Sequence, residues 1–286
     1  MNVQPQRRLG DDAAFCTSLV RERDFPRYAA TLFAPQDKRR ALLALFAFNA
    51  EISHVRDHIT QPLPGEIRLQ WWNDVIAGHD HGDVVGNPVA AELMRAVGAY
   101  ELPREQLQKL IEARIFDVYD DPMPTQDALE AYCRDTSSVL FSLGARILGA
   151  QGEECEHAAR HAGIAQGIAD VVALLPLHAA RHQLYLPREL LEKYDASQTD
   201  IFAGRMTPAL GEIIGRLRAE VLTCLDSAGD LLAGITDNAL PAFLPLALVR
   251  RALRVPAINA FEPKRLSHLT ILWTLWRASR SKTFKV

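Results

Sequence analysis

Two predicted helical segments carry side chains at the i, i+4 spacing that puts two residues on one helix face. Ser53 precedes Asp57 in the first segment, and Leu174 precedes His178 in the second. Carboxylates at this spacing on two facing helices would hold Mg²⁺ between them, because that ion prefers oxygen ligands. Asp57 is the one acidic residue among these four positions, so the pattern does not supply such a set of carboxylate ligands.

The neighbouring side chains do not complete such a site. Leu174 offers no donor atom, and the imidazole of His178 is a poor ligand for Mg²⁺. Glu51 and Asp57 are six residues apart, about 240° around an ideal helix, so their carboxylates would not converge. We therefore expect no bound metal and no cofactor; in an active site, Asp57 and Asp170 would be the metal ligands.

Helical periodicity runs through the chain, and Val, Ile and Thr nowhere alternate with polar residues over the length of a strand. Residues 38–59 are predicted as one helix with two stripes, which is typical of a helix that lines a cavity. The apolar stripe is Leu45, Phe48, Ile52, Val55 and Ile59, and the polar stripe is Asn49, Ser53 and Asp57. Further helices are predicted over residues 66–78, 88–99, 103–119, 126–149, 153–177, 188–194, 207–233, 241–254 and 264–285.

The long predicted helix over residues 153–177 carries two local signals. Gly163 and Gly167 lie four residues apart, a spacing that suits close packing against another helix. Pro176 is expected to end or kink this helix, because proline lacks the backbone N–H and clashes with the preceding turn.

The composition limits the class of protein. The chain has 286 residues, of which 48% are hydrophobic and 23% charged, and its net charge of −3 gives no basic field for nucleic acid. The start of the chain lacks the apolar core of a secretory signal, and no uncharged run reaches the roughly 18–20 residues of a membrane span. The four widely spaced cysteines predict reduced thiols, with no disulfide framework or zinc site. We expect a cytoplasmic protein with a single domain over residues 1–286 and a flexible N-terminus over residues 1–20.

Four segments in register resemble the squalene/phytoene synthase family. They are residues 44–49 (Ala-Leu-Phe-Ala-Phe-Asn), 68–72 (Arg-Leu-Gln-Trp-Trp) followed by Asn-Pro-Val at 87–89, 129–138 around Tyr-Cys, and 163–187 ending in Tyr-Leu-Pro. The resemblance implies an all-α, isoprenoid synthase-type helical bundle around a central cavity. Members that make squalene or phytoene ionise prenyl diphosphates, a reaction in which Mg²⁺ neutralises the leaving group.

Within that family, the chain is similar to the branch that contains the mitochondrial complex I assembly factor. The shared elements include Ala-Phe-Asn at 47–49 followed by Glu51, and Leu-Pro-Leu-His at 175–178 where synthases carry their second pair of aspartates. This resemblance implies a catalytically degenerate protein that helps to assemble respiratory complex I. Its partner would be a complex I subunit or assembly factor, or its cavity would hold an isoprenoid or another lipid.

The resemblance also assigns candidate site residues. The first motif corresponds to Glu51, Ser53, His54 and Asp57, and the second to Asp170, Leu174 and His178. The cavity candidates are Asp117, Tyr132, Gln166 and Arg68. Each has a simpler interpretation: the first motif as a polar helix face, Asp117 as the ion-pair partner of Arg114, Arg68 as the partner of Glu66 or Asp57, and Tyr132 and Gln166 as packing residues.

Two other functions stay open. An active transferase would condense two prenyl diphosphates head-to-head with Mg²⁺, and Glu51, Asp57, Asp117 and Asp170 would then have to support the metal ions. A lipid-binding protein without an assembly role is the third class.

Tryptophans mark two surface candidates. Trp71 and Trp72 are adjacent and face different sides of a helix, so one is expected in the core and the other at an interface. Residues 264–286 are predicted as a basic helix and tail that carries Trp273, Trp276 and Phe284. This segment predicts either peripheral contact with anionic lipid, as at an inner membrane, or a solvated last helix.

Overall fold

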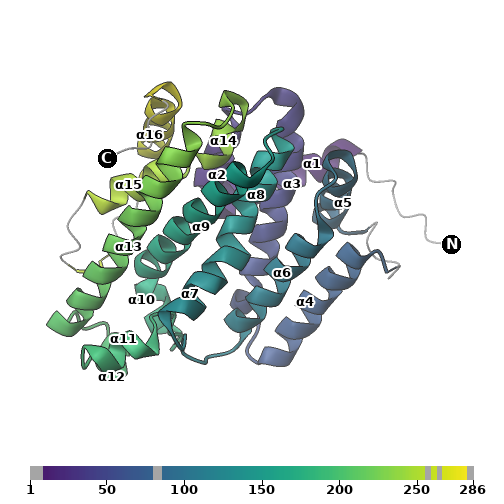
Figure 1. The fold of residues 1–286 in the computed structure, drawn as a ribbon. Helices are drawn as coiled ribbons and strands as arrows, with labels where there is room; N and C mark the ends of the chain where they lie inside the picture. The colour runs from purple at the N-terminus through teal and green to yellow at the C-terminus, as the bar shows by residue number, and fades with distance from the viewer. Residues whose placement is uncertain (1–8, 80–85, 255–258, 263–265, 282–286) are drawn as a thin grey trace.

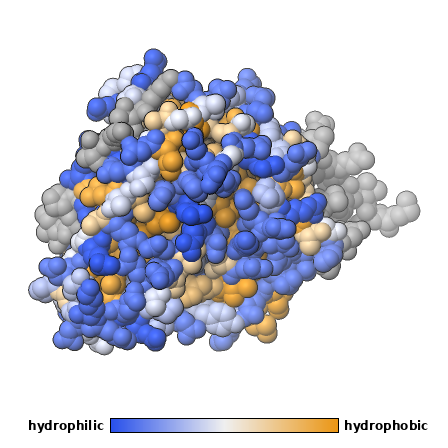
Figure 2. Space-filling view, viewed as in Figure 1, coloured by the Kyte–Doolittle hydropathy of each residue, from blue (hydrophilic) through white to orange (hydrophobic). Residues whose placement is uncertain are grey.

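The computed structural model describes residues 9–79, 86–254, 259–262 and 266–281, and within these ranges it contains helices and no strand. Figure 1 shows the helices running side by side across the molecule, with α4 and α6 at one edge and α13, α15 and α16 at the other. The all-α prediction is confirmed. The face drawn in Figure 2 is largely hydrophilic, with smaller apolar areas between the charged side chains.

The first three helices pack the N-terminal segment onto the core. They are α1 (Leu9–Arg23), α2 (Phe25–Thr31) and α3 (Gln36–Ser53). The predicted flexible N-terminus is wrong for residues 9–20, because α1 buries Cys16 and Val20 and packs against α3 and α5. Residues 1–8 lie outside the described residues.

The helix predicted over residues 38–59 ends at Ser53, so that prediction is wrong beyond this residue. The backbone of His54 leaves the helical region, and its Nδ1 lies 2.8 Å from the carbonyl oxygen of Ala50. This contact satisfies one of the carbonyls that a helix end leaves without an N–H partner. The short 3₁₀ helix η1 (Val55–His58) follows, and Asp57 therefore does not continue the polar stripe of α3.

The next elements are α4 (Pro62–Ala77), α5 (Pro88–Tyr100), α6 (Arg104–Arg114) and the 3₁₀ helix η3 (Ile115–Val118). Gly78 ends α4 in the left-handed conformation, with φ of 86°, which glycine adopts without strain. Asn87 caps α5, since its side-chain oxygen accepts hydrogen bonds from the N–H groups of Val89 and Ala90. Trp72 is 1% exposed, whereas Trp71 is only partly buried, as adjacent positions on one helix predict.

The predicted helix over residues 126–149 contains a bulge. It divides into α7 (Gln126–Cys133), the π-helix η4 (Arg134–Ser138) and α8 (Val139–Ile147). The π-helix packs against α9 (Glu153–Ala173), where a Cβ on Gly163 would lie 2.2 Å from backbone atoms of Ser138. A Cβ on Gly167 would lie 2.5 Å from Sγ of Cys133. The close helix packing predicted at these two glycines is confirmed.

Pro176 divides the remaining helix as predicted: α9 stops at Ala173, and α10 (Leu175–Ala180) begins after Leu174. The later elements are α11 (Arg188–Lys193), α12 (Gln198–Phe202), α13 (Pro208–Leu232), η5 (Asp237–Ala239), α14 (Leu240–Phe243), α15 (Leu246–Leu253) and α16 (His268–Ser281). The single helix predicted over residues 241–254 is wrong, because α14 ends at Phe243 and a separate helix, α15, begins at Leu246. The helix predicted at the C-terminus is confirmed over residues 268–281.

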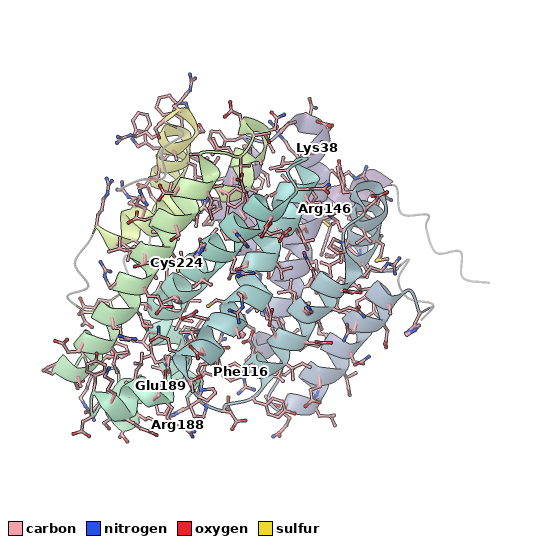
Figure 3. The ribbon with its side chains drawn as sticks, viewed as in Figure 1. Lys38, Phe116, Arg146, Arg188, Glu189 and Cys224 are labelled. Atoms are coloured by element: carbon pink, nitrogen blue, oxygen red, sulfur yellow. The ribbon has the colours of Figure 1, made fainter. Side chains whose placement is uncertain are left out.

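Two segments far apart in the sequence meet at one end of the bundle. The N–H of Met123 donates to the carbonyl of Leu184 at 2.8 Å, and the N–H of Arg188 donates to the carbonyl of Met123 at 2.8 Å. Figure 3 places Phe116, Arg188 and Glu189 at this end and Lys38 and Arg146 at the opposite end. The described helices include none that is long and apolar enough to cross a membrane.

Candidate functional site

An ion pair connects the first motif to the segment that follows the second motif. Nη1 of Arg181, the C-cap residue after α10, donates to Oδ1 of Asp57 at 2.7 Å, although 124 residues separate them in the sequence. The side chains are 35% and 26% exposed, so the pair lies at the surface. Asp57 of the first motif is therefore paired with a cation that the protein itself supplies.

Other carboxylates near the first motif also face arginines. Nη2 of Arg68 donates to Oε2 of Glu51 at 3.1 Å, and Nη2 of Arg56 donates to Oδ1 of Asp120 at 2.8 Å. The predicted pairing of Arg68 with Glu66 or Asp57 is therefore wrong. Helix α3 ends four residues before Asp57, and Arg68 on α4 lies opposite Glu51 instead.

Ser53 and His54 occupy the end of α3. The Ser53 hydroxyl lies 3.1 Å from Nδ1 of His54, and that nitrogen also contacts the carbonyl of Ala50. Both side chains are thus used in closing the helix, which agrees with the interpretation of this motif as a polar helix face.

The second motif presents one carboxylate and no second oxygen donor. Nε2 of Gln166 donates to Oδ1 of Asp170 at 2.8 Å, and burial raises the pKa of Asp170 to about 6. Leu174 is 45% exposed. His178 packs its ring against Tyr185, with centroids 4.4 Å apart, and burial lowers its pKa to about 4. At neutral pH the imidazole of His178 is therefore uncharged.

Asp117 is the centre of a buried polar cluster. Its Oδ1 accepts from the hydroxyls of Tyr132 at 2.7 Å and Tyr185 at 2.6 Å, and Nη1 of Arg114 donates to its Oδ2 at 3.0 Å. Nη1 of Arg114 also donates to the Tyr132 oxygen at 2.7 Å, and Nε2 of Gln183 donates to the Asp117 carbonyl at 3.0 Å. The predicted pairing of Asp117 with Arg114 is confirmed.

The charges in this cluster compensate one another. Burial disfavours the charged form of Arg114, but Tyr132 and Asp117 beside it outweigh that effect and raise its pKa. Burial, with Asp117 adding to it, raises the pKa of Tyr185 far above its ordinary value, so the phenol stays protonated and donates. An ion pair with two further donors on the carboxylate is the arrangement that a buried charge requires.

These residues do not fit Mg²⁺. Asp57 and Glu51 are each held by an arginine, Asp117 is the acceptor of the buried cluster, and Asp170 accepts from Gln166. Within the part of the chain that the structure describes, no three His, Cys, Asp or Glu side chains gather as a metal would require. The structure brings Asp117 together with Tyr132, and Gln166 with Asp170, but it does not bring the four carboxylates to one point.

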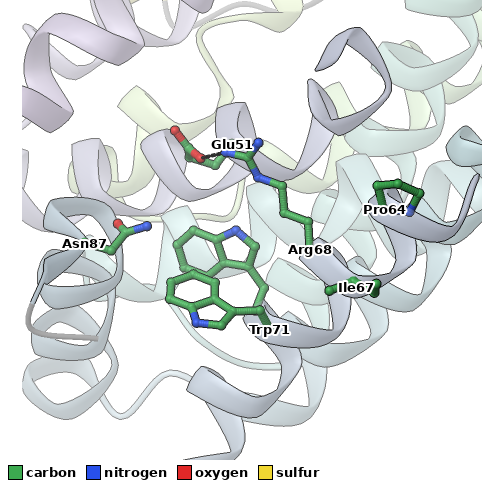
Figure 4. Close-up of a pocket in the computed structure, with 7 residues that line it drawn as sticks. Glu51, Pro64, Ile67, Arg68, Trp71 and Asn87 are labelled. Atoms are coloured by element: carbon green, nitrogen blue, oxygen red, sulfur yellow. Dashed lines mark hydrogen bonds and ion pairs between the residues drawn. The ribbon is translucent and has the colours of Figure 1, made fainter. Parts of the chain in front are cut away.

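A surface pocket of about 360 Å³ lies beside the first motif. Its lining comprises Glu51, Pro64, Ile67, Arg68, Trp71, Trp72 and Asn87. Figure 4 shows the Arg68–Glu51 pair on one side of this pocket and the Trp71 indole below it. Glu51 and Arg68 therefore line a surface pocket, and the partly buried Trp71 gives that pocket an aromatic wall.

The fold and these motifs define the class. A family model described as squalene/phytoene synthase matches residues 20–273, and the chain belongs to that family. Complex I assembly factor 6 of Rattus norvegicus is 29% identical over 236 residues, covering 82% of this chain and 71% of that protein. The Homo sapiens protein is 30% identical over 230 residues, covering 80% and 69%. A presqualene diphosphate synthase of Rhodopseudomonas palustris is 29% identical over 177 residues, covering 60% and 62%.

Solved structures agree on the fold. A squalene synthase from Alicyclobacillus acidocaldarius superposes with a TM-score of 0.72 at 20% identity, covering 96% of this chain and 95% of that one. A dehydrosqualene synthase superposes with a TM-score of 0.78 at 18% identity, covering 96% of each chain. At these identities the likeness concerns the fold, and the predicted isoprenoid synthase-type bundle is confirmed.

Sequence reasoning missed two residues that organise the site. Arg181 follows the second motif by three residues, but nothing in the local sequence connects it to Asp57. Tyr185 begins the Tyr-Leu-Pro motif at 185–187, and that motif is the one sequence feature that indicates a role for Tyr185 in the buried cluster.

Proposed function

We propose that this protein acts in the assembly of respiratory complex I and does not transfer prenyl groups. The observation that carries the proposal is the Arg181–Asp57 ion pair, in which an arginine just after the second motif contacts the carboxylate of the first at 2.7 Å. Ionisation of an allylic diphosphate needs divalent cations held by several oxygen ligands. The second motif supplies Leu174 and His178 at the positions where such ligands would be needed.

The similarity to complex I assembly factor 6 supports the assembly role. The rat protein is 29% identical over 82% of this chain. The presqualene diphosphate synthase of Rhodopseudomonas palustris reaches 29% identity over 60% of the chain, and that of Sinorhizobium fredii reaches 24% over 85%. The role we propose is one of binding, either to an isoprenoid or lipid within the fold or to a complex I subunit or assembly factor on its surface. The location we propose is the cytoplasm with peripheral contact at the inner membrane.

Deletion of the gene tests the assembly role. We expect NADH:ubiquinone oxidoreductase activity in membranes, and the amount of assembled complex on native gels, to fall severalfold and to recover with the wild-type gene. Succinate dehydrogenase activity serves as the control and should not change. Normal complex I activity in the deletion strain would contradict the proposal.

Head-to-head prenyl transfer is the second candidate, favoured by the match to the presqualene diphosphate synthase. Purified protein would be incubated with farnesyl or geranylgeranyl diphosphate and Mg²⁺, and the lipids extracted. A presqualene diphosphate synthase in parallel controls for the assay. We expect no squalene- or phytoene-type product above a heat-denatured sample, and such a product would favour the transferase.

A further inference from the structure

Helix α16 (His268–Ser281) has one apolar face fixed to the protein. Ile271, Leu275 and Ala278 are 7%, 0% and 8% exposed, and the helix packs against α15 and α2. At its start, the His268 ring stacks on Phe25 with centroids 3.7 Å apart. The orientation of the helix on the bundle is therefore defined by packing.

The opposite face of α16 is also apolar, and it is exposed. Leu269, Trp273 and Trp276 are 79%, 58% and 43% exposed, and their spacing of four and three residues places them in one row. The two indoles stack on each other, with centroids 4.9 Å apart and planes at 24°. Large side chains of this kind are the ones that a protein usually covers.

Arginines share this face. Arg277 and Arg280 are exposed, and the guanidinium of Arg280 lies 5.7 Å from the centre of the Trp276 ring. Residues His268–Ser281 include no Asp or Glu. The row therefore combines aromatic rings with positive charge and carries no acidic side chain of its own.

We propose that this row, comprising Leu269, Trp273, Trp276, Arg277 and Arg280, binds the surface of an anionic phospholipid bilayer. Tryptophan is favoured at the membrane–water interface, where its ring meets acyl chains and its N–H meets headgroups. Arginine binds phosphate in the same layer. With 14 residues, α16 is shorter than the roughly 20 that span a bilayer, so it lies flat and inserts one row of side chains.

A second exposed apolar area provides a matched control. Leu63 and Ile67 on α4 are 64% and 62% exposed, comparable to the α16 row. Figure 2 shows apolar side chains at the lower edge of the molecule, over the start of α4. Here both signs of charge are present, since Glu66 is adjacent to Ile67 and Arg68 is paired with Glu51. Charge complementarity to an anionic surface thus separates α16 from α4.

Cosedimentation with vesicles tests the proposal independently of any role in complex I assembly. Wild-type protein should bind vesicles of phosphatidylcholine mixed with phosphatidylglycerol and bind pure phosphatidylcholine much more weakly. The double variant Trp273→Ser/Trp276→Ser should bind the anionic vesicles at least about tenfold more weakly. Each of Arg277→Gln and Arg280→Gln should cost about fivefold, an effect that salt reduces. The control Leu63→Ser/Ile67→Ser should bind like wild type.

All substituted side chains are exposed, and circular dichroism would verify that each variant keeps the helical content of wild type. Equal binding by the tryptophan variant and wild type would overturn the proposal. So would equal affinity for neutral and anionic vesicles, or no vesicle binding by wild type. Association between copies that the tryptophan variant loses, without vesicle binding, would assign the row to a second copy and overturn the lipid surface.

Discussion

Asp117 and Asp57 each face an arginine, but in very different surroundings. Asp117 is 7% exposed and accepts hydrogen bonds from two tyrosines in addition to the contact with Arg114. Asp57 lies at the surface, where its one described partner is Arg181. The buried carboxylate must be compensated for the protein to fold, whereas water could solvate Asp57 without its partner.

The comparison separates a carboxylate that stabilises the fold from one that lies at a motif position on the surface. The Asp117 cluster holds η3, α7 and the segment before α11 together, so its residues are explained by the folded state alone. The Asp57–Arg181 pair contributes little to folding, and its consequence is that a carboxylate at the motif faces an arginine. A surface pair of this kind affects which ligands the site can bind more than it affects the free energy of unfolding.

The largest expected effect is that of removing the buried charge. Asp117→Asn would leave Arg114 buried without its counter-charge, and we expect the free energy of unfolding to fall by about 3 kcal/mol. Urea unfolding followed by circular dichroism measures this change. A loss below about 1 kcal/mol would show that the cluster is not the structural centre that its geometry indicates.

His178 connects the two regions, because it lies in the second motif and packs against Tyr185 of the cluster. Burial lowers its pKa from 6.5 to about 4, so the unfolded chain takes up this proton at a higher pH than the folded protein. The contribution of His178 to the free energy of unfolding therefore rises as the pH increases from about 4 to 6.5. Over this pH range, we expect the free energy of unfolding of wild type to rise by on the order of 2 kcal/mol more than that of His178→Phe. The phenylalanine keeps a ring but does not titrate.

Urea unfolding of wild type and His178→Phe at pH 4 and at pH 6.5 measures this difference. Parallel pH curves for wild type and His178→Phe would mean that the imidazole is equally hydrated in the folded and unfolded states, contrary to its position against Tyr185.

Removing one hydroxyl from the cluster should have a smaller effect. Tyr185→Phe deletes a donor to Asp117, and we expect a loss of about 1–1.5 kcal/mol because the carboxylate keeps its other partners. Tyr119→Phe is the matched control, since its exposed hydroxyl donates to Glu66 and its loss should stay within about 0.5 kcal/mol. Equal losses of unfolding free energy in Tyr185→Phe and Tyr119→Phe would show that hydrogen bonds to the buried and to the exposed carboxylate contribute equally to stability.

The smallest effect is expected at the surface pair. Asp57→Asn makes the same chemical change as Asp117→Asn, yet it should lower the free energy of unfolding by less than about 1 kcal/mol. The same urea experiment compares the two variants directly. A loss at Asp57 as large as that at Asp117 would show that the pair between the motifs is a structural element.

Local chemistry made much of the fold predictable from the sequence. Pro176 breaks the long helix, and Gly163 and Gly167 allow the close contact with η4, because each effect depends on the residue itself. The helix predicted through Ile59 failed because the apolar stripe continues past Ser53, whereas His54 closes the helix through Ala50. Periodicity reports which face is buried, but it does not report where the backbone leaves the helix.

Partners distant in the sequence were not predictable. Arg114 and Asp117 are three residues apart, so their pairing was among the expected outcomes. Arg181 reaches Asp57 across 124 residues, and Arg68 on α4 reaches Glu51 on α3. These contacts depend on how the helices pack, and local patterns in a single sequence do not predict that packing.

Calorimetric titration with farnesyl thiodiphosphate, with and without Mg²⁺, tests most directly the claim that this site no longer holds the metal ions of a prenyl transferase. A presqualene diphosphate synthase under the same conditions provides the positive control. We predict that Mg²⁺ adds no measurable affinity for the analogue in this protein. Tight binding that requires Mg²⁺ and is lost in Asp57→Asn would contradict the account.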